Sequence, residues 1–393
     1  MPNALIFGAG KIGRGFLGQL LHRSGYALCF VDGAPAVVEL LNRERRYRID
    51  IAGRAGSTEY IPVAGAYALS DASGIAEAVA SADLLGCAVG APNLAALAKT
   101  VALALRKRDL AKPLDWLICE NADQPSKTIL NALLENADAP FAEFCTHRLG
   151  LVETQVLRTG MPADPEIARR EPLALKMHDW WTLPCDADAF RGPLPKIEGL
   201  QPRKNFGNEL KRKIYTFNGL NGPISYLGFA NGYRILHEAA NAAELQPLLK
   251  SVMEESAHGL IHEFDFDADE HRRFQQLAWD KYRDVALADA IERNARDSAR
   301  KLGPRERLIG PASLCIKHGR PPHGYAAAIA AAIDYDGSED PGTRQVRELA
   351  AREGAGAVLK KFCGLNEDTE LSRLASHAYE KKAYIVDKGA PRT

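Results

Sequence analysis

The pattern of hydrophobic and polar positions changes twice along the 393-residue chain. Up to about residue 150, short apolar runs alternate with longer segments that have a helical period. The apolar runs predict strands at 4–7, 28–31, 84–89 and 116–120, and the periodic segments predict helices at 12–23, 34–42, 73–80, 93–104 and 126–136. Such alternation predicts a mainly parallel sheet with helices on both faces, which binds its ligands beyond the carboxyl ends of the strands.

The rest of the chain has two other patterns. Residues 151–202 are rich in proline, and short strands from this segment are expected to cover an edge of the sheet. From about residue 205 the chain is alanine-rich, with predicted helices at 208–219, 223–230, 233–259, 270–301 and 322–333. The expected fold class is α/β: a Rossmann-type domain with a strand-rich extension over residues 1–202, followed by a mostly α-helical domain over residues 203–393.

The chain carries 50 basic and 50 acidic residues, so its formal net charge is zero. This balance leaves no basic field for nucleic acid or for an acidic membrane surface. No apolar run reaches the roughly 18 residues of a membrane-spanning helix. Because the sequence begins directly with a strand of the core, we expect no signal peptide and a cytoplasmic location.

Seven cysteines are spread along the chain without any Cys-x-x-Cys motif, at positions 29, 87, 119, 145, 185, 315 and 363. Several lie in apolar runs typical of strands, which favours reduced, buried thiols. A zinc site needs clustered cysteine and histidine ligands, and Cys145, His147 and His178 are too scattered to supply one. No metal is therefore expected.

A glycine-rich turn follows the first predicted strand. It opens a predicted helix, and its residues are Gly8, Ala9, Gly10, Lys11, Ile12 and Gly13. In this dinucleotide-binding layout, Gly8 permits the tight turn, Gly10 lets the backbone approach a pyrophosphate, and Gly13 lets the helix lie close to the strand. The helix N-terminus adds N–H groups and the positive end of its dipole.

Asp32 ends the second predicted strand, nineteen residues after Gly13, and indicates the kind of cofactor. Its carboxylate can accept hydrogen bonds from a ribose diol, whereas a 2′-phosphate would meet a negative charge there, so NAD is favoured over NADP. The alternative, a glycine-rich turn in another kind of α/β protein, does not account for an acid at this distance. Val89 and Gly90 follow a neighbouring strand and are expected to line the same cofactor site.

Three polar residues at the start of the helical region are candidates for catalysis. On a regular helix, Lys213, Asn218 and Asn221 lie within an arc of about 140°, so they can face one substrate. A lysine desolvated between two domains has a lowered pKa and can act as a general base. Carboxamides can orient a hydroxyl group and stabilise a developing alkoxide. The alternative is a solvated lysine on a helix with two asparagines near its end.

Four longer motifs resemble those of one family. Phe7–Phe16, FGAGKIGRGF, resembles its F-G-A-G-N-I-G-R-G-F, and residues 119–121 resemble its C-E-N. Residues 190–199, FRGPLPKIEG, resemble its F-K-G-x-L-P-x-I-x-G, and residues 300–309, RKLGPRERLI, resemble its R-K-L-x-x-x-D-R-L-I. On these motifs the chain resembles the polyol-specific long-chain dehydrogenases over nearly its whole length, and within them the enzymes of the mannitol-1-phosphate 5-dehydrogenase type.

The resemblance implies zinc-independent, NAD-linked oxidation of a secondary alcohol, or the reverse reduction of a ketose. In the family signature K-x-x-x-x-N-x-x-H, Lys213 falls on the general base and Asn218 on the asparagine. Asn121 falls on the asparagine that polarises the substrate oxygen. The histidine of the signature is Asn221 here. A carboxamide can still donate a hydrogen bond and orient the substrate, but only an imidazole titrates near pH 7.

Other departures also lie on the substrate side. Leu157 replaces an acidic residue of the family's V-D-R-I-V-P segment, and residues 281–285, KYRDV, replace its R-F-x-N-P. Arg293 and Arg296 match the arginines that follow in the family. At helical spacing, Arg293, Arg296 and Arg300 can form a cationic wall for a substrate phosphate. The alternative for these arginines is a solvated helix face.

Two hypotheses follow. In the first, the protein is an NAD-dependent dehydrogenase that interconverts a sugar alcohol, or its phosphate, and the corresponding ketose, with Lys213 as general base. In the second, it is an NAD-binding member of the family that acts on another substrate, such as a uronate or a non-phosphorylated polyol, or has little catalytic activity. The retained Lys213 favours the first. We expect a monomer or a weak homo-oligomer; the alternative is a helical domain that serves mainly for association.

Overall fold

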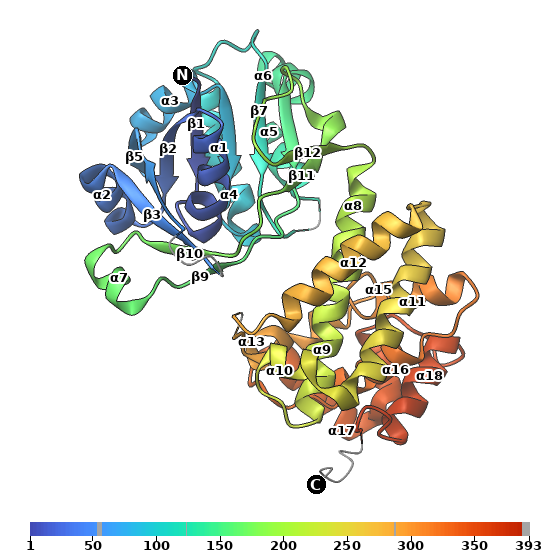
Figure 1. Ribbon diagram of the computed structural model, residues 1–393. Coiled ribbons are helices and arrows are strands. Elements are labelled where there is room, and N and C mark those ends of the chain that lie inside the picture. Colours follow the sequence, from blue (N-terminus) through green and yellow to red (C-terminus); the bar gives the residue numbers. More distant parts are fainter. Residues whose placement is uncertain (53–56, 123, 287, 387–393) are drawn as a thin grey trace. The chain divides into compact units, whose positions relative to one another are not determined.

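The chain divides into two units of different structure, Met1–Phe206 and Gly207–Thr393, where the sequence pattern places the division after residue 202. The computed structural model describes residues 1–52, 57–122, 124–286 and 288–386. The first unit contains a parallel sheet with connecting helices, and the second is helical (Figure 1). The predicted fold class is therefore confirmed.

Six parallel strands form the central sheet of the first unit, in the order β5-β2-β1-β6-β7-β8. Their bounds are β1 Asn3–Phe7, β2 Ala27–Asp32, β5 Gly65–Ala68, β6 Leu84–Cys87, β7 Leu114–Ile118 and β8 Leu149–Glu153. The four strands predicted from the sequence are confirmed, and β5 and β8 add the two edges. The strand order reverses between β1 and β6, so the carboxyl ends of these strands flank the expected ligand crevice.

Helices connect these strands and cover both faces of the sheet (Figure 1). They are η1 Gly13–Gly18, α1 Gln19–Arg23, α2 Pro35–Glu44, α3 Ala72–Ser81, η2 Ala91–Asn93, α4 Leu94–Leu105, α5 Pro125–Leu134 and α6 Ala139–His147. In β1, Ala4 and Ile6 belong to one apolar cluster, whereas Leu5 and Phe7 belong to another. Both faces of the strand are buried, which explains its uninterrupted apolar sequence.

Two smaller sheets complete the first unit. One has the strand order β4-β3-β10-β9, and the other pairs β11 with β12. The strand bounds are β3 Arg46–Ile51, β4 Thr58–Pro62, β9 Gly160–Met161, β10 Leu175–Met177, β11 Leu183–Asp186 and β12 Leu200–Arg203. The same part of the chain contains the short helices α7 Pro165–Arg170 and η3 Ala187–Ala189. The first residues of segment 151–202 belong to β8, at the edge of the central sheet. Of its later strands, β10 pairs with the open edge of β3. β11 pairs with β12 and also meets the end of β8, through an antiparallel bridge between Cys185 and Thr154, so this part of the segment lies along the edge of the sheet as expected.

The second unit is built from helices. They are α8 Phe206–Lys213, η4 Ile214–Asn218, α9 Gly219–Ala230, α10 Leu236–Asn241, η5 Ala243–Leu245, α11 Gln246–Phe264, α12 Ala268–Arg283, α13 Ile291–Ala295, α14 Ser298–Lys301, α15 Ile309–Lys317, α16 His323–Ile333, α17 Pro341–Lys361 and α18 Glu370–Glu380. The helices predicted over 233–259 and 270–301 are wrong in extent, since each is split. The extended residue before α10 and the one before α13 form an antiparallel bridge, between Ile235 and Ala290.

Two helices form the centre of the second unit. Residues Gly324–Ile333 of α16 are all buried, as are residues 219–228 of α9. An α-helix that is apolar on every side is typical of a buried position. Within the described parts of the chain, no helix combines the length and the apolar character needed to cross a membrane.

Candidate active site

Close backbone contacts shape the glycine turn after β1. Gly8 has a φ of +92°, and its N–H donates to the carbonyl oxygen of Val31 at 2.7 Å. A Cβ atom on Gly13 would lie 1.8 Å from the carbonyl oxygen of Gly8. No side chain fits at position 13, so the helix lies directly against the turn, as a dinucleotide-binding site requires.

Gly10 faces open space instead. A Cβ atom at this position would meet no atom within 4 Å, so the backbone can be approached from outside. The chain enters the helix at Lys11 and Ile12. Because the first N–H groups of a helix have no partner within it, this end can receive an anionic group.

Asp32 is tied to the glycine turn by hydrogen bonds. Its Oδ2 accepts from the backbone N–H of Ala9 at 2.7 Å, and its Oδ1 accepts from the N–H of Ala34 at 2.8 Å. Each carboxylate oxygen can accept a further hydrogen bond. The carboxylate is therefore fixed in orientation and still able to accept hydrogen bonds from a ribose diol.

A cavity of about 480 Å³ lies beside this turn. Its lining comes from the carboxyl ends of β1, β2, β5 and β6 and from η2 and α4. It consists of Phe7, Gly8, Gly10, Val31, Asp32, Gly33, Ala34, Leu69, Ala88, Val89, Asn93, Ala96 and Leu97. The size is typical of a small-molecule site. Leu69, Ala96 and Leu97 are apolar residues of this lining. The sequence did not indicate them, because apolar helix and loop residues look alike whether or not they contact a ligand.

Glu120 fixes the turn after β6. Its Oε1 accepts hydrogen bonds from the N–H groups of Val89 at 2.6 Å and Gly90 at 3.1 Å. Burial raises the pKa of Glu120, and these two hydrogen bonds oppose the rise. Asn121, the next residue, is exposed at the carboxyl end of β7. The acid of the C-E-N motif therefore positions the Val89–Gly90 turn, while Asn121 lies at the edge where ligands bind.

Lys213 precedes a widened helical turn, and Asn218 is the last residue of that turn. α8 ends at Lys213, and η4 is a π-helical turn in which the N–H of Gly219 donates to the carbonyl of Ile214, five residues earlier. A turn of this width places residues five apart above one another, and such turns are frequent at functional sites. The expectation of a regular helix is therefore wrong. The widened turn brings Lys213 and Asn218 closer to one face than the arc of a regular helix does.

Hydroxyl groups of neighbouring helices hold the backbone of η4. Ser256 of α11 donates to the carbonyl oxygen of Tyr215 at 2.8 Å. Tyr282 of α12 donates to the carbonyl oxygen of Phe217 at 3.0 Å. Buried carbonyl groups need such partners, so tertiary contacts specify the widened turn.

A third hydroxyl group serves the start of α9. Pro223 lies inside this helix and has no N–H, which leaves the carbonyl of Gly219 without its helical donor. Tyr325 of α16 supplies the missing hydrogen bond at 3.1 Å. Three helices thus fix the segment that carries the candidate catalytic residues.

Lys213 is half-buried, and its surroundings disfavour the charged amine. Burial is the main cause that lowers the pKa of Lys213, to about 8. The positive charges of Lys281 and Arg307 act in the same direction, and Glu306 opposes them. An amine with this pKa is substantially neutral slightly above physiological pH, as a general base requires.

Lys281 lies over the same turn. Its Nζ is 5.8 Å from the centre of the Phe217 ring, and burial lowers its pKa to about 8, with Asp289 opposing the shift. In the sequence, Lys281 is only a departure from the family's arginine. In the structure, the positive charge of Lys281 also lowers the pKa of Lys213.

Asn221 is buried and has a fixed orientation. Its Nδ2 donates to the Oδ1 of Asn294 at 3.1 Å, and the Nδ2 of Asn294 donates to the carbonyl of Ala290 at 2.9 Å. A carboxamide does not titrate, so Asn221 acts as a fixed dipole where the family signature has histidine. Asn294 was not indicated by the sequence, since its partner lies 73 residues away.

Lys301 is a third lysine with a lowered pKa. It is buried, and its ammonium donates to the carbonyl oxygens of Asn294 and Arg296. Burial lowers its pKa to about 7, and the charge of Arg307 acts in the same direction. Lys301 thereby fixes the backbone of the residue that orients Asn221.

The three candidate arginines do not share one helix. Arg293 on α13 forms an ion pair with Asp289, and Arg300 on α14 pairs with Asp297 at 2.7 Å. Arg296 lies between these helices with extended backbone (φ −51°, ψ 157°) and an exposed side chain. The continuous wall expected from helical spacing is therefore wrong, because the helix is broken at Arg296. A role of these arginines in substrate binding stays a prediction.

The candidate catalytic residues are divided between the two units. Asn121 belongs to the first, whereas Lys213, Asn218 and Asn221 come together in the second, on η4 and its flanks. In the described ranges, no group of three or more His, Cys, Asp or Glu side chains could hold a metal ion. All seven cysteines are free thiols.

Two family models match the chain. The mannitol dehydrogenase Rossmann domain matches residues 2–199, and the mannitol dehydrogenase C-terminal domain matches residues 209–381. A curated relative, mannitol-1-phosphate 5-dehydrogenase of Thermoanaerobacter pseudethanolicus, is 30% identical over 373 residues, which are 94% of this chain and 95% of that protein.

Two solved structures share the fold. A D-sorbitol dehydrogenase in substrate-free form has a TM-score of 0.78 at 16% identity, with 96% of this chain and 92% of that chain covered. Mannitol 2-dehydrogenase of Pseudomonas fluorescens, in a ternary complex with NAD and D-mannitol, has a TM-score of 0.71 at 15% identity, with 97% and 92% covered.

Proposed function

The chain belongs to the mannitol dehydrogenase family, and on this premise we propose that it is an NAD-dependent, zinc-independent dehydrogenase that interconverts a phosphorylated sugar alcohol and its ketose phosphate. The observation that carries the proposal is Lys213, with a pKa lowered to about 8, directly before the widened turn that ends at Asn218. Relatives named mannitol-1-phosphate 5-dehydrogenase support the substrate class. We further propose a cytoplasmic location and a monomer or weak homo-oligomer.

In the oxidative direction, Lys213 takes the proton of the substrate hydroxyl as general base. Asn218 donates a hydrogen bond to the same oxygen as negative charge develops, and family resemblance assigns this role to Asn121 as well. When bound, NAD supplies the acceptor for the hydride of the carbinol carbon. In the reverse direction, the ammonium of Lys213 returns the proton to the carbonyl oxygen.

Asn221 orients the substrate and moves no proton. The hydrogen bond from its Nδ2 to Asn294 fixes the orientation of the carboxamide before the substrate binds. Pre-organised dipoles of this kind need no rearrangement during the reaction. In this proposal the proton leaves through Lys213, because the chain has no histidine at the signature position.

The charges around Lys213 favour an anionic substrate. Lys281 and Arg307 act on it as cations, against the single carboxylate of Glu306. A substrate phosphate adds the negative charge that balances this surplus. Arg296 is the candidate partner of that phosphate, since among the described residues no ion pair engages it.

The role of Asp32 predicts the cofactor preference. NADH is expected to bind more tightly than NADPH, because a 2′-phosphate would face the Asp32 carboxylate and like charges in contact cost several kcal/mol. Asp32→Asn keeps an oxygen that can accept from Ala9 and removes the charge, so the preference is expected to fall by about tenfold or more. Fluorescence titration with NADH and with NADPH measures this preference as the ratio of the two Kd values. Tighter binding of NADPH to the unaltered protein contradicts this role.

The charge of Lys281 predicts the pH profile. Oxidation needs neutral Lys213, so kcat/KM is expected to rise through a pKa of about 8. Lys281→Gln removes a charge that lowers this pKa, so the acid limb moves to higher pH. Activity at pH 7 then falls about threefold to tenfold, since one pKa unit corresponds to tenfold. Lys281→Arg keeps the charge and is expected to keep the profile. An unshifted limb in Lys281→Gln contradicts the coupling.

A further inference from the structure

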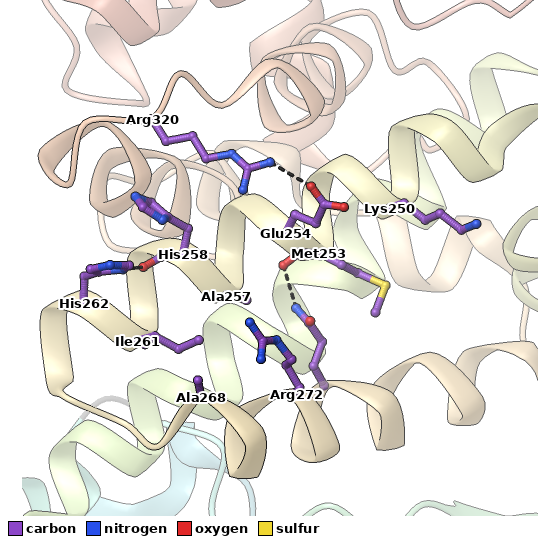
Figure 2. Close-up of a pocket in the computed structure, with 11 residues that line it drawn as sticks. Lys250, Met253, Glu254, Ala257, His258, Ile261, His262, Ala268, Arg272 and Arg320 are labelled. Carbon is purple, nitrogen blue, oxygen red and sulfur yellow. Dashed lines mark hydrogen bonds and ion pairs between the residues drawn. The ribbon is translucent and has the colours of Figure 1, made fainter.

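A groove of about 780 Å³ lies between α11 and α12 of the second unit (Figure 2). None of the candidate catalytic residues lines it. Its floor is apolar, formed by Met253, Ala257 and Ile261 of α11 and by Ala268 of α12. The three α11 residues are spaced by four, so they form one stripe along the helix. The stripe can lie against the flat apolar part of a ligand.

The walls of the groove carry more positive than negative charge. Lys250, Arg272 and Arg320 line it as cations, and Glu254 is the one carboxylate among the described lining residues. Figure 2 shows Arg272 extending from α12 toward the groove, and Arg320 on the opposite side. Arginine matches phosphate oxygens with two parallel hydrogen bonds.

The backbone of Arg320 is held in place before any ligand binds. Gly319 has a φ of +81° and ends α15, and the N–H of Arg320 donates to the carbonyl of Cys315 at 3.0 Å. The two prolines that follow restrict the chain further. Its guanidinium donates to Glu254 at 2.8 Å.

The competing ion pairs are exposed and therefore weak. Arg272 pairs with Asp269 at 3.3 Å, and both side chains are largely in solvent. Glu254 is also mostly exposed in its pair with Arg320. Exposed pairs of this kind contribute little to stability, so a multivalent anion can replace them.

Two histidines complete one end of the groove. The Nε2 of His258 contacts the carbonyl of His318 at 2.9 Å, and the Nδ1 of His262 contacts the carbonyl of His258 at 2.8 Å. A carbonyl oxygen only accepts, so each of these nitrogens carries the proton. The other nitrogen of each ring takes no part in these hydrogen bonds.

We propose that this groove binds a nucleotide-like organic phosphate, with its ring on the apolar floor and its phosphates between Arg272 and Arg320. The volume lies in the range of small-molecule sites and exceeds what a bare phosphate group fills. The apolar stripe favours a ligand with a ring over a simple polyanion. This site does not depend on the proposed dehydrogenase activity.

Isothermal titration of the full-length protein tests the proposal. The probes are GTP, tripolyphosphate and guanosine. NAD is left out, because it is itself a nucleotide phosphate and would compete for the groove, and the matched variants separate the groove from the cavity of the first unit. We expect GTP to bind most tightly, tripolyphosphate to bind more weakly and guanosine to give no measurable heat. Absent GTP binding, or GTP no tighter than tripolyphosphate, overturns the proposal.

Matched variants locate the site. Arg272→Ala/Arg320→Ala is expected to weaken GTP binding by about tenfold or more, because it removes the charge-assisted hydrogen bonds. Both side chains are at least partly exposed, so the protein is expected to fold. Arg352→Ala/Arg373→Ala removes the same charge from α17 and α18, outside the groove, and is expected to leave the affinity unchanged. Equal affinities in both double variants overturn the assignment.

Discussion

Replacing Lys213 with alanine is expected to lower kcat for alcohol oxidation by roughly 10²- to 10⁴-fold, the usual contribution of a general base. The amine has a lowered pKa and precedes the widened turn that ends at Asn218, and no histidine occupies the signature position to take over the proton. Affinity for NADH is expected to be unchanged, because the residues assigned to the cofactor belong to the first unit. Steady-state kinetics and NADH fluorescence titration measure the two quantities.

Two further variants distinguish the loss of the general base from the loss of a positive charge. Lys211→Ala removes an exposed lysine two positions earlier on the same helix and is expected to keep full activity. Lys213→Arg keeps a cation whose pKa is too high for a base at neutral pH, so it is expected to be as inactive as Lys213→Ala. If Lys213→Ala kept most of the activity, the assignment of the base would be wrong.

Two alanine substitutions in the glycine turn are expected to affect different properties, one the stability of the protein and the other its affinity for NADH. Gly13→Ala places a methyl group 1.8 Å from a backbone oxygen, so the free energy of unfolding is expected to fall by about 1–3 kcal/mol or more. The methyl group of Gly10→Ala meets no atom within 4 Å, so the free energy of unfolding of this variant is expected to equal that of the unaltered protein. It projects a methyl group where a pyrophosphate approaches, so the Kd for NADH is expected to rise about tenfold or more.

Denaturant unfolding and NADH titration of both variants test this pair. The two changes are chemically identical, so any difference between them comes from the surroundings of each position. Normal stability of Gly13→Ala contradicts the close backbone contact. Unchanged NADH affinity in Gly10→Ala contradicts the placement of the pyrophosphate at this turn.

The features predicted well from the sequence depend on local patterns. The strands of the central sheet have uninterrupted apolar sequences because both faces are buried. Gly8, Gly13 and Asp32 form a short motif in which each residue has a steric or hydrogen-bonding reason visible from spacing alone. These elements need few long-range contacts to be recognised.

The features that were missed depend on residues far apart in the chain. The widened turn after Lys213 is held by hydroxyl groups of Ser256 and Tyr282, more than 40 residues away. The effect of Lys281 on Lys213 arises only once α12 packs on that turn. A single sequence contains no signal for such pairings, so the charges that lower the pKa of the base could not be predicted.

The most direct test of the proposed function is NADH oxidation with a panel of ketoses, namely fructose 6-phosphate, fructose and a set of uronates, on protein shown to bind NADH. Turnover with fructose 6-phosphate is expected at a kcat/KM well above those of the other compounds. Flat traces with every ketose, while NADH still binds, would contradict it.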